Sequence, residues 1–267
     1  MTNHPFLEAI SSKVTANGHY ICVGLDPDLS KIPSHFPQTM SGLSDFLTQI
    51  IESTVDLAIA YKPNISFFEG FGLDGLKLLE KVCRRIDGRV PIIIDGKRGD
   101  IGNTSKMQAR YMFDYFGADA TTLHPYMGID SLAPFFEYKD KFNFVLSLTS
   151  NPSAVDFEKC RLENNKPMYM YVAQTCSEWN STYKNIGLVV GATQEEMPEI
   201  RSANPELLFL VPGVGHQGGS YDDVVRDGLN REGLVLINMS RSILYASNQK
   251  DFSEQSRSEL IKHQNVV

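Results

Sequence analysis

A short segment of the chain, DGKRGDIGNTS at positions 95–105, carries acidic and basic side chains directly after the apolar run PIII at 91–94. Asp95 and Lys97 are two positions apart, and strand side chains with that spacing point to the same face. Asp100 follows beyond Gly99, where the backbone can turn sharply. Acids and bases grouped at the end of a buried strand could press on a substrate anion and supply a proton to it.

Eight short apolar runs predict the strands that would position these residues. They are near-continuous rather than alternating, which is typical of strands buried on both faces of a parallel sheet. The runs are 20–25, 57–63, 90–95, 119–125, 142–149, 186–193, 207–214 and 234–240. Helical periodicity lies between them, as in 43–59, where Ser44 is the expected N-cap, and in 104–117, which Gly117 is expected to end.

Eight strand–helix units in 267 residues predict one (β/α)₈ TIM barrel, a single domain over residues 1–267. No linker rich in Pro, Gly or Ser interrupts the rhythm. This fold carries its chemistry at the C-terminal ends of its strands, so the residues that close each run are the candidates. They are Asp26, Lys62, Asp95 with Lys97, His124, Ser150, the segment 212–219, and Ser240 with Arg241.

Composition narrows the function classes. The formal charge of −7 argues against a nucleic-acid-coating surface. No window approaches the roughly 18 apolar residues of a membrane span, and the N-terminus lacks a signal-peptide pattern, so we expect a cytoplasmic protein. The scattered cysteines fit neither a disulfide framework nor a zinc site and are expected to be reduced and mostly buried; they are Cys22, Cys83, Cys160 and Cys176.

Lys62 ends the second predicted strand, beside the third if consecutive strands are neighbours. It would complete a Lys-Asp-Lys-Asp array with Asp95, Lys97 and Asp100. Unit charges about 4 Å apart interact by about 4 kcal/mol at an effective dielectric near 20, so all four stay ionised only if acids and bases alternate. Ion pairs that merely tie the barrel rim together are the alternative, but a cluster of four favours a functional site.

Two segments near the C-terminus predict a phosphate site. VPGVGHQGGS at 211–220 follows the seventh strand and NMSRS at 238–242 follows the eighth, where this fold often binds phosphate. The glycines allow close approach, while Gln217 and Arg241 offer donors. A glycine-rich turn without a ligand is the alternative. Neither segment matches GxxxxGK[ST], which argues against ATP or GTP hydrolysis.

These motifs together resemble the orotidine 5′-phosphate decarboxylase family, particularly its longer bacterial branch (type 2). The motifs occur in order between residues 20 and 245: GLDPD at 24–28, YKPN at 61–64, DGKRGDIGNT at 95–104, LTSNP at 148–152, PGVGHQGG at 212–219 and NMSRSI at 238–243. The resemblance implies a carboxy-lyase that converts orotidine 5′-monophosphate (OMP) to uridine 5′-monophosphate (UMP), the last step of de novo pyrimidine synthesis. It implies no metal and no organic cofactor.

The resemblance also implies roles for individual residues. Lys62, Asp95, Lys97 and Asp100 match the catalytic tetrad, with Lys97 as the proton donor to C6 and Asp95 crowding the leaving carboxylate. The substrate-binding residues would be Asp26, Ile101, Thr104, Ser150, Pro212, Gln217, Gly218 and Arg241. The enzyme would be a homodimer in which Asp100, Ile101 and Thr104 complete the partner's site. Whether Ser150 or Thr149 reads the base is open, and His124 and His216 receive no role.

Two alternative functions also fit parts of this sequence. Sugar-phosphate decarboxylases and aldolases on this scaffold keep Asp-x-Lys-x-x-Asp but use Mg²⁺, and they need a carboxylate from the second strand where this chain has Lys62. A catalytically silent nucleotide-binding protein would keep the phosphate segments alone. Retention of every charged position argues against the silent protein.

Overall fold

The computed structural model describes residues 4–215 and 218–264, and its described strands form one parallel sheet. Each predicted apolar run contains or overlaps one strand. The strands are β1 (Ile21–Leu25), β2 (Ala60–Pro63), β3 (Ile93–Arg98), β4 (Ala120–Leu123), β5 (Phe142–Leu148), β6 (Ile186–Val190), β7 (Phe209–Pro212) and β8 (Leu236–Met239). Every residue of β1, β2, β4, β6 and β8 is buried, as the continuous apolar pattern predicts.

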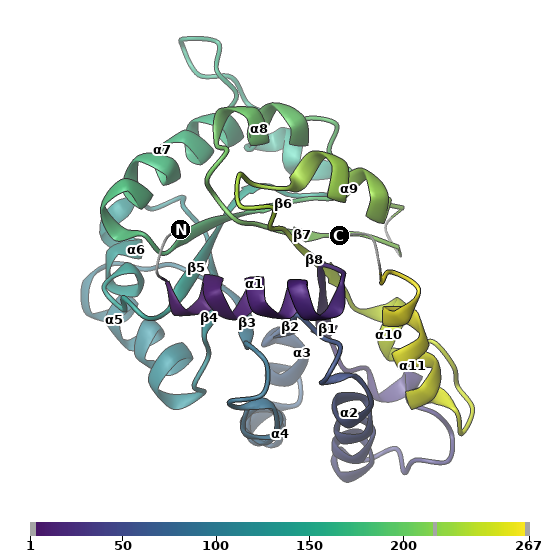
Figure 1. Ribbon diagram of the computed structural model, residues 1–267. Helices are drawn as coiled ribbons and strands as arrows, with labels where there is room; N and C mark the ends of the chain where they lie inside the picture. The colour runs from purple at the N-terminus through teal and green to yellow at the C-terminus, as the bar shows by residue number, and fades with distance from the viewer. Residues whose placement is uncertain (1–3, 216–217, 265–267) are drawn as a thin grey trace.

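The sheet runs in the hydrogen-bonded order β2-β1-β8-β7-β6-β5-β4-β3. Isolated parallel bridges join β2 and β3, the first and last strands in this order; they pair Tyr61 with Ile92 and Asn64 with Asp95. At the second bridge, the Ile65 amide donates to the Asp95 carbonyl at 3.2 Å. The sheet therefore closes, and the predicted (β/α)₈ barrel is confirmed (Figure 1).

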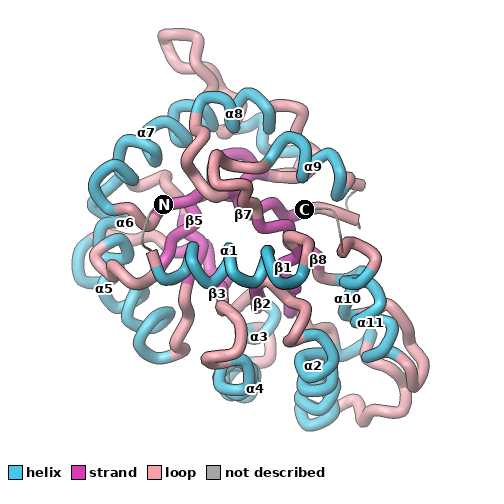
Figure 2. The backbone as a smooth tube through the Cα atoms, in the orientation of Figure 1, coloured by secondary structure: helices cyan, strands magenta, loops and turns pink. Residues whose placement is uncertain are grey.

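Helices surround the strands on the outside (Figure 2). The α-helices are α1 (Pro5–Asn17), α2 (Met40–Thr54), α3 (Ser66–Glu69), α4 (Gly72–Ile86), α5 (Gly102–Arg110), α6 (Ile129–Phe136), α7 (Met168–Tyr183), α8 (Met197–Ala203), α9 (Tyr221–Gly228), α10 (Arg241–Leu244) and α11 (Phe252–Ile261). Short 3₁₀ segments occupy Leu29–Lys31 and Pro152–Asp156. Helix α1 crosses one end of the barrel, where Phe6 stacks on Phe142 at the start of β5. It thus covers the N-terminal ends of the strands.

The helix predicted at 43–59 begins earlier than expected. It is α2, and the predicted N-cap, Ser44, is wrong: the Thr39 hydroxyl caps the helix by accepting from the Gly42 amide. A Cβ at position 42 would lie 2.0 Å from the Pro37 carbonyl oxygen, so glycine lets the helix start against the preceding loop. Ser44 instead accepts a hydrogen bond from Lys81.

The helix predicted at 104–117 is α5 followed by one π-helical turn, Tyr111–Tyr115. Its predicted end is confirmed, because Gly117 has a φ of 68°. Such a conformation is costly for residues with a side chain.

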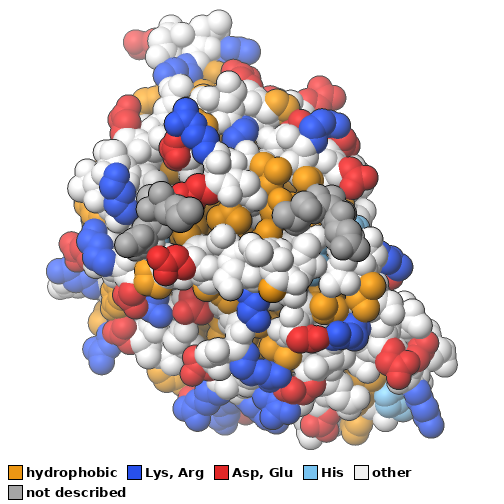
Figure 3. All heavy atoms as spheres, in the orientation of Figure 1, with side chains coloured by type: hydrophobic (Ala, Val, Ile, Leu, Met, Phe, Trp, Pro, Cys, Tyr) orange, Lys and Arg blue, Asp and Glu red, His pale blue; other side chains and the backbone are white. Residues whose placement is uncertain are grey.

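The structure also shows how the charged side chains and the cysteines are distributed. On the face shown in Figure 3, acidic and basic side chains occur over most of the surface, with a group of basic side chains at the lower edge of the view. Cys22, Cys83 and Cys176 are buried and Cys160 is exposed, and all four thiols are free. None of the helices in the described ranges is both long enough and apolar enough to span a bilayer.

The corrected cap generates a stability prediction. Thr39→Ala should lower the free energy of unfolding by about 1 kcal/mol, because the Gly42 amide loses its partner at the start of α2. Urea unfolding measures the change. Thr48→Ala is the matched control, since the Thr48 hydroxyl donates back to the Ser44 carbonyl within the helix, and it should change stability by less than about 0.5 kcal/mol. Equal effects would contradict the cap.

Candidate active site

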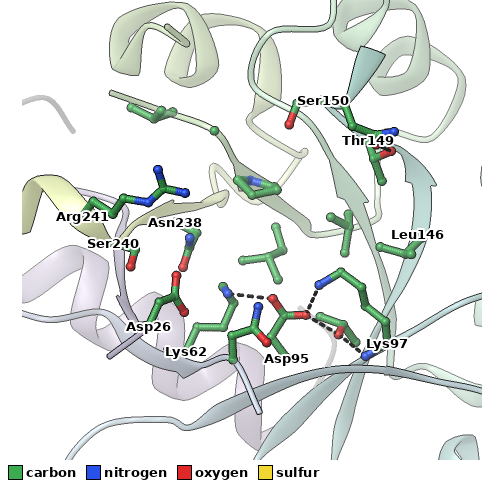
Figure 4. A pocket seen from close by; sticks show the side chains of 18 of the residues that line it. Asp26, Lys62, Asp95, Lys97, Leu146, Thr149, Ser150, Asn238, Ser240 and Arg241 are labelled. Carbon is green, nitrogen blue, oxygen red and sulfur yellow. Dashed lines mark hydrogen bonds and ion pairs between the residues drawn. The ribbon is translucent and has the colours of Figure 1, made fainter. Parts of the chain in front are cut away.

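A cavity of about 350 Å³ opens at the C-terminal ends of the strands, the end opposite α1 (Figure 4). All eight strands, or the residues directly after them, contribute to its lining. Leu146, Val189 and Leu210 are among its apolar lining residues, and charged and polar side chains make up much of the remainder. A concave site with a few convergent polar groups is the usual form of a small-molecule site.

Three of the four predicted charged residues converge in this cavity. The Asp95 carboxylate lies between two ammonium groups, with Lys62 Nζ 2.9 Å from Oδ2 and Lys97 Nζ 2.6 Å from Oδ1. The Thr122 hydroxyl donates to Oδ1 at 2.7 Å. The side chain of Lys62 is 5% exposed and that of Lys97 is 48% exposed, so Lys97 is the more exposed of the two lysines that line the cavity.

The balance between burial and charge keeps the buried pair ionised. Burial alone raises the pKa of Asp95, but Lys62 and then Lys97 outweigh it and hold that pKa far below its ordinary value. Burial likewise lowers the pKa of Lys62, but the charges of Asp95 and Asp26 reverse the effect and raise it. At neutral pH the carboxylate and the Lys62 ammonium are both charged.

The backbone of β3 is irregular where it presents these groups. The register with β4 shifts between Ile94 and Arg98, and Lys97 has a φ of 45°. The Lys97 amide donates to the Thr122 hydroxyl at 2.9 Å, which helps to hold this conformation. Left-handed backbone in a non-glycine residue is strained and is concentrated at functional sites.

His124, which had no predicted role, supports the turn after β3. Its Nε2 lies 3.1 Å from the Gly99 carbonyl oxygen. A Cβ on Gly99 would lie 2.9 Å from the same ring atom, so the glycine allows the close contact. This contact positions the segment that leads to Asp100.

Asp100, Ile101 and Thr104 do not line the cavity of their own chain. Asp100 accepts a hydrogen bond from the Ile101 amide, the Ile101 side chain is 56% exposed, and Thr104 is exposed near the start of α5. The four-membered array expected at one site therefore has three members within a single chain. The chain turns outward after Gly99, and this turn carries Asp100 away.

The two predicted phosphate segments lie side by side. Pro212, Gly213 and Arg241 line the cavity, and a Cβ on Gly215 would lie 3.7 Å from the Ser242 hydroxyl. Gly218 borders a neighbouring hollow instead, with its amide donating to the Gly215 carbonyl. Gln217 and His216 lie outside the described residues.

Ser150 and Thr149 both line the cavity, but their surroundings differ. The Thr149 hydroxyl lies 2.7 Å from a Glu158 carboxylate oxygen and 2.6 Å from Asn151 Oδ1, so it anchors the following loop. A Cβ on Gly191 would lie 2.8 Å from the Ser150 amide nitrogen, so that glycine lets Ser150 approach the end of β6. Both residues line the cavity, so the choice between Ser150 and Thr149 as the side chain that reads the base stays a prediction.

Sequence reasoning missed several polar lining residues. They include Asn64, Thr122 and Asn238; Asp26 and Ser240 were among the predicted candidates and line the same cavity. Asn64 lies inside the quoted YKPN motif, two positions after Lys62, and that spacing could have identified it. Thr122 carries no comparable local signal, because it faces Asp95 across neighbouring strands.

Comparison with known proteins places this geometry in a family. The model of the orotidine 5′-phosphate decarboxylase / HUMPS family matches residues 19–255. The chain belongs to this family. An orotidine 5′-phosphate decarboxylase of Herpetosiphon aurantiacus is 43% identical over 254 residues, covering 94% of both chains. The Flavobacterium johnsoniae protein of the same name is 42% identical over 268 residues, covering 99% of this chain and 96% of the relative.

Solved structures agree with this family membership. The structure of Leishmania donovani OMP decarboxylase superimposes with a TM-score of 0.82 at 35% sequence identity. The match covers 97% of each chain. The family likeness therefore includes the whole barrel as well as its motifs.

The buried ion pair generates a prediction about pH. The depressed pKa of Asp95 gives stability that is present above the ordinary value of about 3.9 and is lost as the pH falls below it. Asp95→Asn should therefore cost about 3 kcal/mol of unfolding free energy at pH 7, because Lys62 loses its counter-charge, and progressively less below about pH 4. Urea unfolding of the wild-type protein and the variant at pH 7 and at pH 3 measures the difference.

The control for this prediction is Asp74→Asn, which removes an exposed partner of Lys77. It should cost less than about 0.5 kcal/mol at either pH. A cost of Asp95→Asn that stays constant between pH 7 and pH 3 would contradict the ionised pair.

Proposed function

We propose that the protein decarboxylates OMP to UMP, the last step of de novo pyrimidine synthesis, without a metal or an organic cofactor. The observation that carries the proposal is the Asp95 carboxylate clamped between Lys62 and Lys97 at the wall of the cavity. Family membership and relatives named for this reaction, which match more than nine-tenths of the chain, support the choice of substrate. The free thiols and a water-soluble nucleotide substrate fit a cytoplasmic location.

Lys97 is the proton donor in this proposal. When the bond between C6 and the carboxyl carbon breaks, CO₂ leaves and the electron pair stays on C6, in the plane of the ring. The pair cannot delocalise into the ring, so a fixed cation beside C6 is the stabiliser that is needed. The Lys97 ammonium reaches the cavity and is positioned to stabilise the pair and then transfer a proton to C6.

Asp95 destabilises the bound substrate in this proposal. A substrate carboxylate about 4 Å from Asp95 is repelled by about 4 kcal/mol at an effective dielectric near 20. Loss of CO₂ removes this repulsion, whereas the binding of the distant phosphate is unchanged, so phosphate binding can offset the ground-state cost. Lys62 keeps Asp95 ionised and in place throughout.

The remaining contacts divide between the parts of the nucleotide. Arg241, with Pro212 at the end of β7 and with Gln217 and Gly218 from the segment after it, binds the phosphate. Ser150 reads the pyrimidine edge, and Asp26 binds the ribose. The positions of Arg241, Pro212, Ser150 and Asp26 around one cavity support this assignment.

The proposed working unit is a homodimer of single-barrel subunits in which Asp100, Ile101 and Thr104 complete the site of the partner. The exposure of Ile101 and Thr104, and the absence of all three residues from the cavity lining of their own chain, support this arrangement. Large apolar side chains are exposed on neighbouring segments, with exposed fractions of 60% for Met107 and 86% for Tyr126. A surface of this kind is typical of an interface between proteins.

The magnesium-dependent alternative is disfavoured by the donor set. Two ammonium groups flank Asp95 and repel a divalent cation. Among the described residues, no three His, Cys, Asp or Glu side chains are grouped as metal ligands.

Turnover of OMP tests the proposed reaction. The loss of absorbance of OMP should proceed with purified protein in EDTA. Lys97→Ala should lower kcat at least about a thousandfold and keep UMP binding, because the proton donor is lost while the rest of the cavity remains. Lys77→Ala, at an exposed lysine of α4, is the control and should leave kcat unchanged. Turnover that stops in EDTA would contradict metal-independent chemistry, and turnover that persists in Lys97→Ala would contradict the proton donor.

Mixed dimers test the shared site. Lys97→Ala and Asp100→Ala should each be inactive alone, whereas co-refolding equal amounts should restore about a quarter of wild-type activity. Half of the dimers are then mixed, and one of the two sites in each mixed dimer has both residues intact. A steady-state assay of the refolded mixture measures the recovery, and mixed dimers isolated by their two different tags should show about half of wild-type activity. If mixing restores nothing, Asp100 acts within its own chain and the shared site is wrong.

A further inference from the structure

Three buried oxygen atoms line one wall of the cavity without a hydrogen-bond partner among the described residues. They are Asp26 Oδ1, Asn238 Oδ1 and Ser240 Oγ. Figure 4 shows the three side chains gathered on one side of the cavity, between Lys62 and Arg241. Buried polar atoms are nearly always paired in native proteins, so three orphaned oxygens at one ligand cavity indicate a ligand group that pairs with them.

The packing of β1 against β8 brings these atoms together. Cys22 lies opposite Asn238 in the parallel register. A Cβ on Gly24 would lie 2.7 Å from Ser240 Cβ and 3.0 Å from Asn238 Oδ1, so both side chains occupy the space that Gly24 leaves open. Asp26 directly follows β1 on the same side of the cavity. The wall is thus built by a glycine in one strand and by polar residues at the end of its neighbour.

The chemistry of the wall selects its ligand. An ionised carboxylate only accepts hydrogen bonds, and the amide oxygen of Asn238 also only accepts. Two adjacent acceptors fit a group with two donors side by side and repel a phosphate. Vicinal hydroxyls of a sugar meet this requirement, while Arg241 at the far edge of the wall suits the phosphate.

We propose that Asn238 Oδ1 accepts a hydrogen bond from a ribose hydroxyl next to the one held by Asp26, so that Asn238 is a second sugar-reading residue. The inference rests on the proposed function, which supplies the ribose. Asn238 is 8% exposed, so loss of its hydrogen bond is not compensated by bulk water. Asp26 also contributes to the raised pKa of Lys62, so the sugar wall adjoins the catalytic pair.

The test compares how each protein binds UMP and its two deoxy analogues, 2′-deoxyuridine and 3′-deoxyuridine 5′-monophosphate. Titration calorimetry gives the ratio of Kd for each analogue to Kd for UMP. Asn238→Leu, which replaces the amide with an apolar group of similar size, should reduce this ratio about tenfold for one analogue. It should leave the Kd of that analogue nearly unchanged, because the analogue lacks the hydroxyl that Asn238 recognises.

Two further variants control the experiment. Asn238→Asp keeps an acceptor oxygen in the same shape, so the ratio should stay near wild type even if the added charge weakens all three ligands together. Asn143→Leu replaces a buried asparagine of β5 whose Oδ1 also lacks a partner but which does not line the cavity. It should leave the ratio unchanged.

The outcomes distinguish failure of the role proposed for Asn238 from failure of the proposed reaction. The sugar-reading role is overturned if Asn238→Leu weakens the binding of all three ligands equally, or weakens the binding of none. It is also overturned if Asn238→Asp loses the wild-type ratio of Kd values. OMP turnover by the wild-type protein is measured on the same preparation. A wild-type protein that shows the predicted ratios without turnover would overturn the proposed reaction and keep the inference.

Discussion

The buried carboxylate of Asp95 is the constraint on which the remainder of this site depends. It is stable as an anion only because Lys62 and Lys97 contact it from opposite sides. The same residue lies at the seam where β2 and β3 close the barrel through isolated bridges, one of which joins Asn64 to Asp95. The ion pair between Lys62 and Asp95 therefore joins β2 to β3 at this seam. The same contact helps to close the barrel and sets the charge of the site.

In the proposed reaction, the group that repels the substrate and the group that attracts it lie in different parts of the cavity. The negative charge of Asp95 lies where the proposed substrate carboxylate must leave, and Arg241 lies at another edge of the same cavity. Binding energy gained at the phosphate can then hold the reacting group against a repulsion that disappears in the transition state. Lys97 differs from Lys62 in its exposure to the cavity, and this difference gives the two lysines different parts in the proposed reaction.

Three positions that are strained or depend on glycine lie around this cavity. Lys97 has left-handed backbone geometry, Gly24 gives space to Asn238 and Ser240, and Gly191 gives space to Ser150. A side chain at either glycine would collide with a residue of the cavity wall. The wall is therefore built by close approach of neighbouring strand ends.

The sequence by itself determined the number and order of the strands, because continuous apolar runs record burial on both faces of a parallel sheet. It also predicted that Asp95 and Lys97 lie together, which they do, although the left-handed backbone at Lys97 shows that regular strand alternation alone does not bring them together. Only the tertiary structure decided that Thr122 faces Asp95, that Asn238 faces the cavity beside Asp26, and that Asp100 turns away. These placements depend on the register between strands and on the direction of the turns that follow them, and periodicity along one segment carries no information about either.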